Sequence, residues 1–334
     1  SFDPVPSIAV MAEKLRLAAG KSSNYELVVT QRKLGGNGPI MANALASLGL
    51  DVTYIGSVGA PEVHPVFQDF AAKARVIGVV DAGHTDALEF NDGKIMLGKY
   101  TCLNDLTWEN LIARVGRPEL DAMIDGAALI GMVNWTMIPQ MSQIWEHLLD
   151  EVFVKKPTSD RLLFIDLADP EKRTADDLVA ALRLVGRFQE HVGVILGLNL
   201  KEAGRVVDVL GLPRRPEPLT TIREDAEAIR EALGIGCVVI HPRRGAAAAK
   251  GDGSAMFDGP FVEHPLISTG AGDHFNAGFC LGQMLGLDLE QSLCAGVAAS
   301  GYYVRHAQSP TVAELAAFVA DLPKAEALTS KGPR

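Results

Sequence analysis

Short apolar runs alternate with stretches of helical character along most of the chain. Strands that read as nearly continuous apolar runs, separated by helices, are typical of a parallel sheet that is covered on both faces. The pattern therefore predicts an α/β fold, a three-layer sandwich with a mostly parallel central sheet between helices. The candidate strands are residues 52–57, 76–80, 128–133, 162–166, 192–196 and 237–241, and the candidate helices are residues 39–48, 65–73, 138–152, 175–190, 201–210, 223–233, 272–285, 289–304 and 312–321.

Two segments break this alternation. About residues 23–34 have extended, alternating character, and about residues 86–101 read as a hairpin with an Asp-Gly turn, a pair that tolerates the positive φ of such turns. Neither fits a βαβ unit, so we expect them to form a small β lid on a single domain spanning residues 1–334. Flaps of this kind often cover active sites. Residues 246–258 predict another hairpin.

Composition narrows the possible partners. The chain has 334 residues, 48% of them hydrophobic, and a formal net charge of −10, which disfavours nucleic acid or an anionic membrane as the main partner. No apolar run approaches the roughly 20 residues that span a bilayer, and no secretory signal is evident at the start, so we expect a cytoplasmic protein. The four cysteines are scattered and predict free thiols.

The strongest chemical signal is residues 268–279, where a small, polar loop enters an apolar helix. Gly270 and Gly272 allow close approach of the backbone to a ligand, and the unpaired N–H groups and dipole of a helix start favour an anion. Asp273 lies in the first turn, where it would act either as a general base or only as a helix cap. His274 is its neighbour, but adjacent helical residues point about 100° apart, so we assign it no catalytic role.

This segment resembles the C-terminal signature of the ribokinase-like superfamily, also called the phosphofructokinase B family of carbohydrate kinases. The resemblance implies that Asp273 is the catalytic base and that the backbone of Gly270, Ala271 and Gly272 forms the anion hole. Where relatives carry an acidic residue that helps to hold an activating monovalent cation, this chain has Ile267.

A second glycine-rich loop precedes an alanine-rich helix at Gly35, Gly36 and Asn37. Taken alone, this loop would be interpreted as a tight packing turn rather than as a binding loop. It is similar to the N-terminal signature of the same family, which implies contact with the substrate. The asparagine usual in that signature falls on Ile40, so the sugar contact is either lost or moved to Asn37 or Asn43.

Weaker matches lie between and before these signatures. Asn199 and Glu202, three apart at a helix start, form a common pattern by themselves, but they resemble the family motif that organises magnesium through water. The loop with Arg243 and Gly245 resembles one that touches the nucleotide. Asp3 resembles the aspartate at the end of the family's first strand, which binds substrate hydroxyls.

The resemblance implies an ATP- and Mg²⁺-dependent kinase that transfers the γ-phosphoryl group to a hydroxyl of a sugar or related polyol, with a possible homodimer through the β lid. The alternatives are a nucleoside or vitamin-precursor kinase of the same fold, and a non-catalytic sugar- or nucleotide-binding sensor. The implied nucleotide-binding residues are Asn199, Arg243, Gly245, Thr269 and Gly272, and the implied substrate-binding residues are Asp3, Gly35, Gly36, Asn37 and Asp273.

Overall fold

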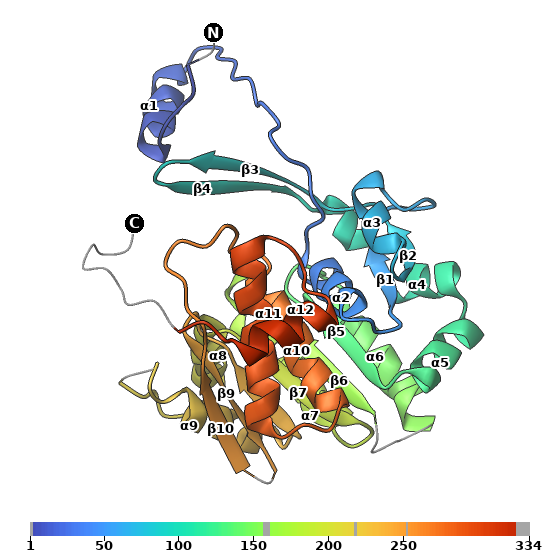
Figure 1. The fold of residues 1–334 in the computed structure, drawn as a ribbon. Coiled ribbons are helices and arrows are strands. Elements are labelled where there is room, and N and C mark those ends of the chain that lie inside the picture. The colour runs from blue at the N-terminus through green and yellow to red at the C-terminus, as the bar shows by residue number, and fades with distance from the viewer. Residues whose placement is uncertain (1–2, 156–160, 217–218, 252, 325–334) are drawn as a thin grey trace.

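The computed structural model describes residues 3–155, 161–216, 219–251 and 253–324. Within these ranges, six strands form the main sheet in the order β10-β9-β8-β7-β6-β5 (Figure 1). Strands β5 to β8 are parallel, as expected, whereas β9 and β10 are antiparallel, because a short turn rather than a helix joins β8 to β9. The strands are β5 (Leu129–Val133), β6 (Leu162–Asp166), β7 (Gly193–Leu198), β8 (Cys237–Ile240), β9 (Gly245–Lys250) and β10 (Gly253–Asp258).

Two layers of helices cover this sheet. Successive side chains of a strand point to opposite faces: Leu163 and Ile165 of β6 belong to one apolar cluster, and Phe164 to another. All three are fully buried, so the central strands are covered on both faces. The first layer consists of α6 (Met141–Glu151), α7 (Ala175–Phe188), α8 (Leu200–Val209) and α9 (Ile222–Leu233), and the second of α2 (Asn37–Ser47), α10 (Ala271–Met284), α11 (Leu289–His306) and α12 (Val312–Ala320).

Strands β1 (Thr53–Ser57) and β2 (Arg75–Val80) form a separate parallel pair. In the described part of the chain, no backbone pairing joins them to the main sheet, although their sequences predict strands of the same kind. Two short helices, α4 (Trp108–Val115) and α5 (Arg117–Gly126), occupy a region to which the apolar pattern assigned no element; Gly116, at φ 83°, separates them. The remaining short helices are α3 (Gln68–Ala71), η1 (Pro65–Phe67), η2 (Thr101–Asp105), η3 (Phe153–Lys155) and η4 (Pro170–Lys172).

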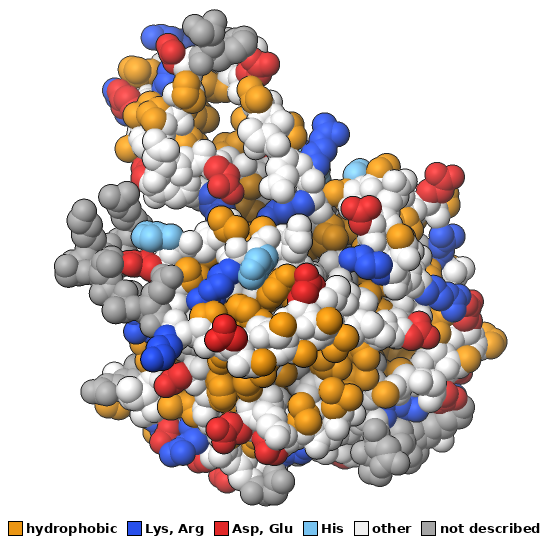
Figure 2. All heavy atoms as spheres, viewed as in Figure 1, with side chains coloured by type: hydrophobic (Ala, Val, Ile, Leu, Met, Phe, Trp, Pro, Cys, Tyr) orange, Lys and Arg blue, Asp and Glu red, His pale blue; other side chains and the backbone are white. Residues whose placement is uncertain are grey.

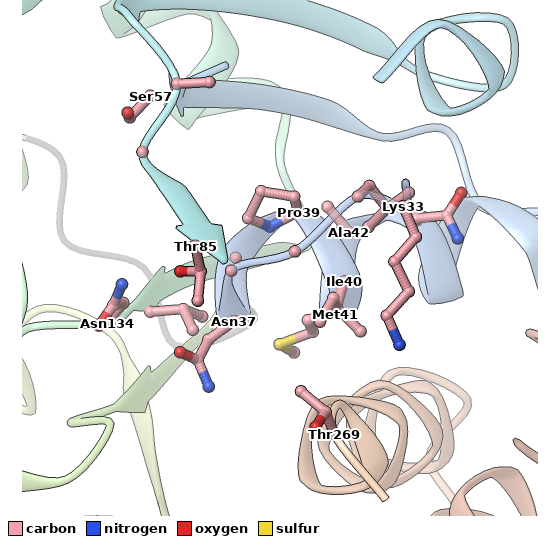
Figure 3. A pocket seen from close by; sticks show the side chains of 18 of the residues that line it. Lys33, Asn37, Pro39, Ile40, Met41, Ala42, Ser57, Thr85, Asn134 and Thr269 are labelled. Carbon is pink, nitrogen blue, oxygen red and sulfur yellow. The ribbon is translucent and has the colours of Figure 1, made fainter. Parts of the chain in front are cut away.

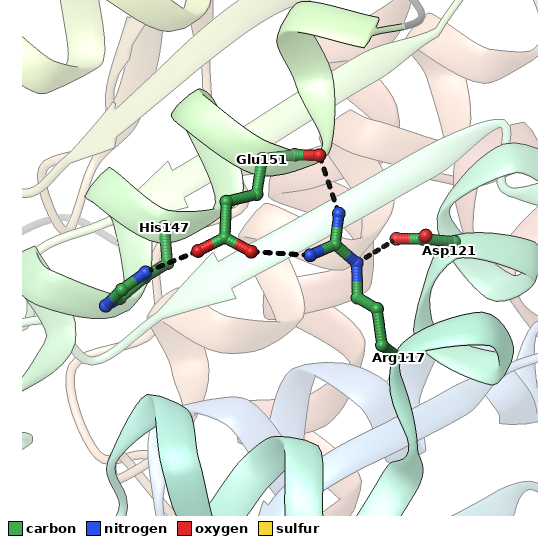
Figure 4. Close-up of polar contacts among 4 residues, drawn as sticks. All are labelled: Arg117, Asp121, His147 and Glu151. Atoms are coloured by element: carbon green, nitrogen blue, oxygen red, sulfur yellow. Dashed lines mark hydrogen bonds and ion pairs between the residues drawn. The ribbon is translucent and has the colours of Figure 1, made fainter.

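Arg117 connects α5 to α6 (Figure 4). Its guanidinium donates to Asp121 Oδ1, to Glu151 Oε2 and to the Glu151 carbonyl oxygen, each at 2.6 Å. The other carboxylate oxygen of Glu151 lies 2.8 Å from His147 Nδ1. Because these side chains are partly exposed, the network orients the two helices more than it stabilises the fold.

A long hairpin projects above the sheet. It consists of β3 (His84–Phe90) and β4 (Gly93–Lys99), in antiparallel register, and α1 (Ile8–Ala18) lies at its tip, where the Ile8 N–H donates to Asp92 Oδ1 at 2.8 Å (Figure 1). Residues 23–34 form no strand, so the expected lid is a two-stranded hairpin with an unpaired chain beside it. Figure 2 shows this lobe standing apart from the body, with basic side chains near the junction. In the described ranges, no helix has the length and apolar character needed to cross a membrane.

Candidate active site

A cavity of about 2990 Å³ lies beneath the hairpin, beside α2 and the loop before α10. Its walls include Gly35 and Asn37 at the start of α2, Thr269 before α10, and Asn199 with Glu202 at the start of α8. Figure 3 shows Asn37 and Thr269 projecting into this space from opposite sides. Three motifs that are far apart in the sequence therefore meet at one cavity.

The glycine loop before α10 has the backbone of an anion cradle. Gly270 is the N-cap, with φ 94°, and no side chain caps the helix start. A Cβ atom at Gly270 would lie 3.2 Å from Ile40 Cγ2, and one at Gly272 would lie 3.1 Å from His241 Cε1. Close packing and a left-handed backbone conformation therefore require glycine here, and the free helix start leaves N–H groups for an anion.

Asp273 is held in the first turn of α10 and is only 5% exposed. Its Oδ1 accepts a hydrogen bond from Asn37 Nδ2 at 3.2 Å. Burial raises the pKa of Asp273 to about 7; the Asn37 hydrogen bond opposes this rise and the negative charge of Glu202 adds to it. Asp273 does not itself line the cavity, but Asn37 does. A substrate hydroxyl that replaced the Asn37 amide would contact a carboxyl group whose pKa is close to neutral pH. Such a pKa suits a general base.

The glycine-rich signature at the start of α2 has Ile40 where the resembling family has an asparagine. Ile40 packs against Gly270, so the position that carries asparagine in the family signature contributes an apolar contact to the cradle. Asn43 donates from Nδ2 to Ser309 Oγ at 3.3 Å. Of the two candidate asparagines, Asn37 and Asn43, it is therefore Asn37 whose side chain contacts Asp273.

A buried acidic group that the motifs did not include lies next to Asp273. Asp166, at the carboxyl end of β6, accepts a hydrogen bond from Asn276 Nδ2 at 2.8 Å through Oδ2. Its Oδ1 is buried without a partner among the described residues. Burial raises the pKa of Asp166 well above its ordinary value, and the charges of Glu202 and Asp273 add to this effect. A carboxylate at the carboxyl end of a central strand was the sequence signal for this residue.

Asn199 and Glu202 form a capping box at the start of α8. Asn199 Oδ1 accepts from the Glu202 N–H at 3.0 Å, and Glu202 Oε2 accepts from the Asn199 N–H at 2.9 Å. Glu202 Oε1 also accepts from the Asp169 N–H at 2.7 Å. Both residues line the cavity. They also cap the helix, as the common sequence pattern alone would suggest. In the described part of the chain, no three His, Cys, Asp or Glu side chains are grouped to hold a metal ion directly.

Three predicted residues lie less centrally. Arg243 and Gly245 are not among the residues that line the cavity; Arg243 lies over the Phe261 ring at 5.8 Å. A Cβ at Gly245 would approach the Phe257 carbonyl oxygen to 2.6 Å, so this glycine is required by the β9–β10 pairing. Asp3 is exposed and lines the cavity beside the hairpin lobe.

Two lysines were not predicted at the site. Lys94, at the start of β4, donates from Nζ to Thr269 Oγ1 at 3.3 Å, which joins the hairpin to the glycine loop. Lys33 lies nearby and points toward Thr269 (Figure 3); burial and the charge of Lys94 lower its pKa. No local sequence signal marks these lysines, because only the position of the hairpin brings them to the loop.

Comparisons with known proteins show the family and the fold of this chain. The model of the prokaryotic ketohexokinase family matches residues 1–322. The ketohexokinase of Haloferax volcanii is 29% identical over 321 residues, which cover 95% of this chain and 84% of the relative. The solved structure of a Burkholderia thailandensis nucleoside kinase with inosine has a TM-score of 0.62 at 18% identity and covers 89% of this chain and 91% of that one. The ribokinase of Thermotoga maritima has a TM-score of 0.63 at 16% identity, with 89% and 91% covered. The chain therefore belongs to the prokaryotic ketohexokinase family, and it is a sugar kinase with the ribokinase-like fold.

Proposed function

We propose that this protein transfers the γ-phosphoryl group of ATP to a hydroxyl group of a ketohexose, with Asp273 as the general base. The observation that carries the proposal is the contact of Asn37 with Asp273 beside the glycine loop. It joins a residue of the cavity wall to the carboxyl group at the anion cradle. The choice of a ketohexose follows the name of the Haloferax volcanii relative.

In the proposed reaction, a sugar hydroxyl replaces the Asn37 amide at Asp273 Oδ1. Asp273 takes the hydroxyl proton while the oxygen bonds to the γ-phosphorus, and the bond from that phosphorus to the leaving oxygen of ADP breaks. The N–H groups of Gly270 and Gly272 stabilise the charge of the transferring group, which is the function of a preorganised anion hole. The Ala271 N–H, which the family resemblance also implied, donates instead to the Ser268 carbonyl oxygen at 3.2 Å.

The acidic group suits a divalent cation held through water. Asp166 Oδ1 is a buried acceptor with no hydrogen-bond partner among the described residues. The charges of Glu202 and Asp273 raise the pKa of Asp166, and the charge of Glu202 also raises that of Asp273. Magnesium, when bound, would offset phosphate charge. Asp166 and Glu202 would then orient its water ligands, with Asn199 beside them.

The hairpin is the proposed lid. Lys94 connects it to Thr269, next to the cradle, so a bound sugar would lie between the hairpin and α2. Closure would keep water away from the phosphoryl group and favour transfer to the sugar over hydrolysis.

The test is ADP release by the wild-type protein and by Asp273→Asn over fructose, other hexoses, ribose and inosine. The variant should lose about a hundredfold to ten-thousandfold in kcat, the usual contribution of a general base, while its affinity for ADP changes little. Asp176→Asn, in the first turn of α7, is the matched control and should have wild-type activity. Equal kcat in Asp273→Asn and the wild type would contradict the assigned role, and turnover only with inosine would contradict the sugar acceptor.

A further inference from the structure

Two stacked aromatic side chains lie against the glycine loop and bond its carbonyl oxygens. The Tyr303 hydroxyl donates to the Thr269 carbonyl oxygen at 3.0 Å. His274 Nδ1 lies 2.7 Å from the Gly270 carbonyl oxygen. The two rings stack with centroids 3.6 Å apart and an interplanar angle of 14°. His274 is 1% and Tyr303 is 8% exposed, so both are fixed by their surroundings.

These bonds determine where the loop amides point. In a planar trans peptide, a carbonyl group and the following N–H point in opposite directions. The bond from Tyr303 to the Thr269 carbonyl therefore turns the Gly270 N–H away from Tyr303. The Gly270 carbonyl oxygen accepts from the His274 backbone N–H at 3.1 Å, and the His274 ring adds a second bond to it. The Ala271 N–H of the same peptide group donates to the Ser268 carbonyl oxygen at 3.2 Å, so it closes the loop rather than pointing at an anion. Gly270, at φ 94°, needs such support because its backbone is otherwise the most mobile of any residue type.

The protonation of His274 is also defined by its partners. A carbonyl oxygen only accepts, so Nδ1 must carry the proton, and Nε2 accepts from Ser309 Oγ at 2.9 Å. Ser309 Oγ in turn accepts from Asn43 Nδ2, which belongs to the substrate signature on α2. Burial lowers the pKa of His274 to about 4, so the ring stays neutral near neutral pH. The chain of hydrogen bonds thus runs from α2 to the cradle.

We propose that Tyr303 and His274 are positioning residues that hold the Thr269 and Gly270 carbonyl groups and thereby keep the Gly270 amide directed toward the transferring phosphoryl group. The inference rests on the proposed function, and it adds two residues that line the cavity and act through the backbone of the glycine loop. This positioning role differs from a packing role in what it requires. Packing would require the two stacked rings, whereas positioning also requires the Tyr303 hydroxyl.

Tyr303→Phe tests this distinction, since it keeps the ring and its stacking and removes only the donor to Thr269. The expected result is a fall in kcat of about tenfold, less than the loss from deleting an anion-hole donor itself. KM for the sugar, the dissociation constant of ADP and the thermal midpoint should stay at wild-type values. Affinity for ADP with aluminium fluoride, which resembles the transferring phosphoryl group, should fall by the same factor as kcat.

Tyr302→Phe is the matched control. Tyr302 is the preceding residue of α11, and its hydroxyl contacts the exposed Glu314 rather than the loop. It should match the wild type in every measurement. If Tyr303→Phe also matches the wild type, the proposal is overturned. The same holds if its kcat falls together with its thermal midpoint and its ADP affinity, because that pattern indicates packing.

His274→Leu provides the second arm, with His306→Leu as its control. His306 repeats the local arrangement at the surface: its Nδ1 lies 2.9 Å from the carbonyl oxygen of Tyr302, four residues earlier, and its ring stacks on Tyr302. His274→Leu should lower kcat and the affinity for ADP with aluminium fluoride, whereas His306→Leu should not. If His274→Leu does not fold, Tyr303→Phe decides. A wild-type protein that releases no ADP with any sugar would instead remove the proposed function, and this inference with it.

Discussion

The side-chain amide of Asn37 donates to the carboxylate of Asp273 at 3.2 Å, across 236 positions of sequence. The contact joins the start of α2 to the start of α10, two helix N-termini that face each other beside the cavity. Ile40, which stands in the place of the asparagine usual in the resembling signature, packs against Gly270. The asparagine that contacts Asp273 lies three residues earlier.

We predict that kcat/KM rises with pH through a midpoint near 7. The base must be deprotonated to accept a proton, and the pKa of Asp273 is raised to about 7, mainly by burial. Glu202→Gln removes a negative charge that contributes to this rise, so the midpoint should move to lower pH. Gln keeps an acceptor oxygen for the Asn199 N–H and so retains the capping box at the start of α8, but it loses the bond from the Asp169 N–H.

Glu314→Gln is the control for this pH profile. Glu314 forms the equivalent capping box with Thr311 at the start of α12, at an exposed position. The pH midpoint of kcat/KM in Glu314→Gln should equal that of the wild type. A Glu202→Gln midpoint that stays in place or moves upward would contradict the electrostatic coupling with Asp273.

We also predict that Asp273→Asn changes the dependence of stability on pH. Burial raises the folded-state pKa of Asp273 from its ordinary value of 3.8 to about 7, so between about pH 4 and pH 7 the folded protein binds more protons at this site than the unfolded chain does. This contribution therefore makes the free energy of unfolding decrease as pH rises through that window. The asparagine variant lacks it and should gain on the order of 1 to 3 kcal/mol relative to the wild type between pH 4.5 and pH 8.

Urea unfolding of both proteins across this pH range measures the difference directly. His241 and His274, whose pKa values burial lowers to about 4, act in the opposite direction below about pH 6.5, but they are present in both proteins and cancel in the comparison. A stability difference that does not change with pH would show that Asp273 is not buried as described.

The contact between the hairpin and the glycine loop predicts an effect on sugar binding. Lys94→Met removes the donor to Thr269 Oγ1 and should raise KM for the sugar about fivefold, the equivalent of about 1 kcal/mol for one hydrogen bond. Lys250→Met is the control, because Lys250 also donates from a strand end to a side chain, that of Gln283, away from the cavity. An unchanged KM in Lys94→Met would mean that the hairpin does not close over the sugar.

Much of the fold could be predicted from the apolar pattern. The strands of the main sheet and most helices differ by only a few residues from their expected bounds, because buried strands and amphipathic helices leave different periodicities in the sequence. The pattern could not predict that β1 and β2 pair apart from the main sheet, since strand pairing depends on contacts between distant segments. The pattern also predicted an extended lid segment at residues 23–34, but these residues form no strand in the structure.

The sequence by itself determined the cradle at Gly270 and the carboxyl group of Asp273, because a glycine loop at a helix start is defined by neighbouring residues. It also identified Asn37 as one of two candidate contacts. Only the tertiary structure showed that Asn37 contacts Asp273, brought Asp166 and Lys94 to the site, and placed Tyr303 against the glycine loop. Those relationships depend on the packing of segments far apart in the chain, and so does the burial that raises the pKa of Asp273.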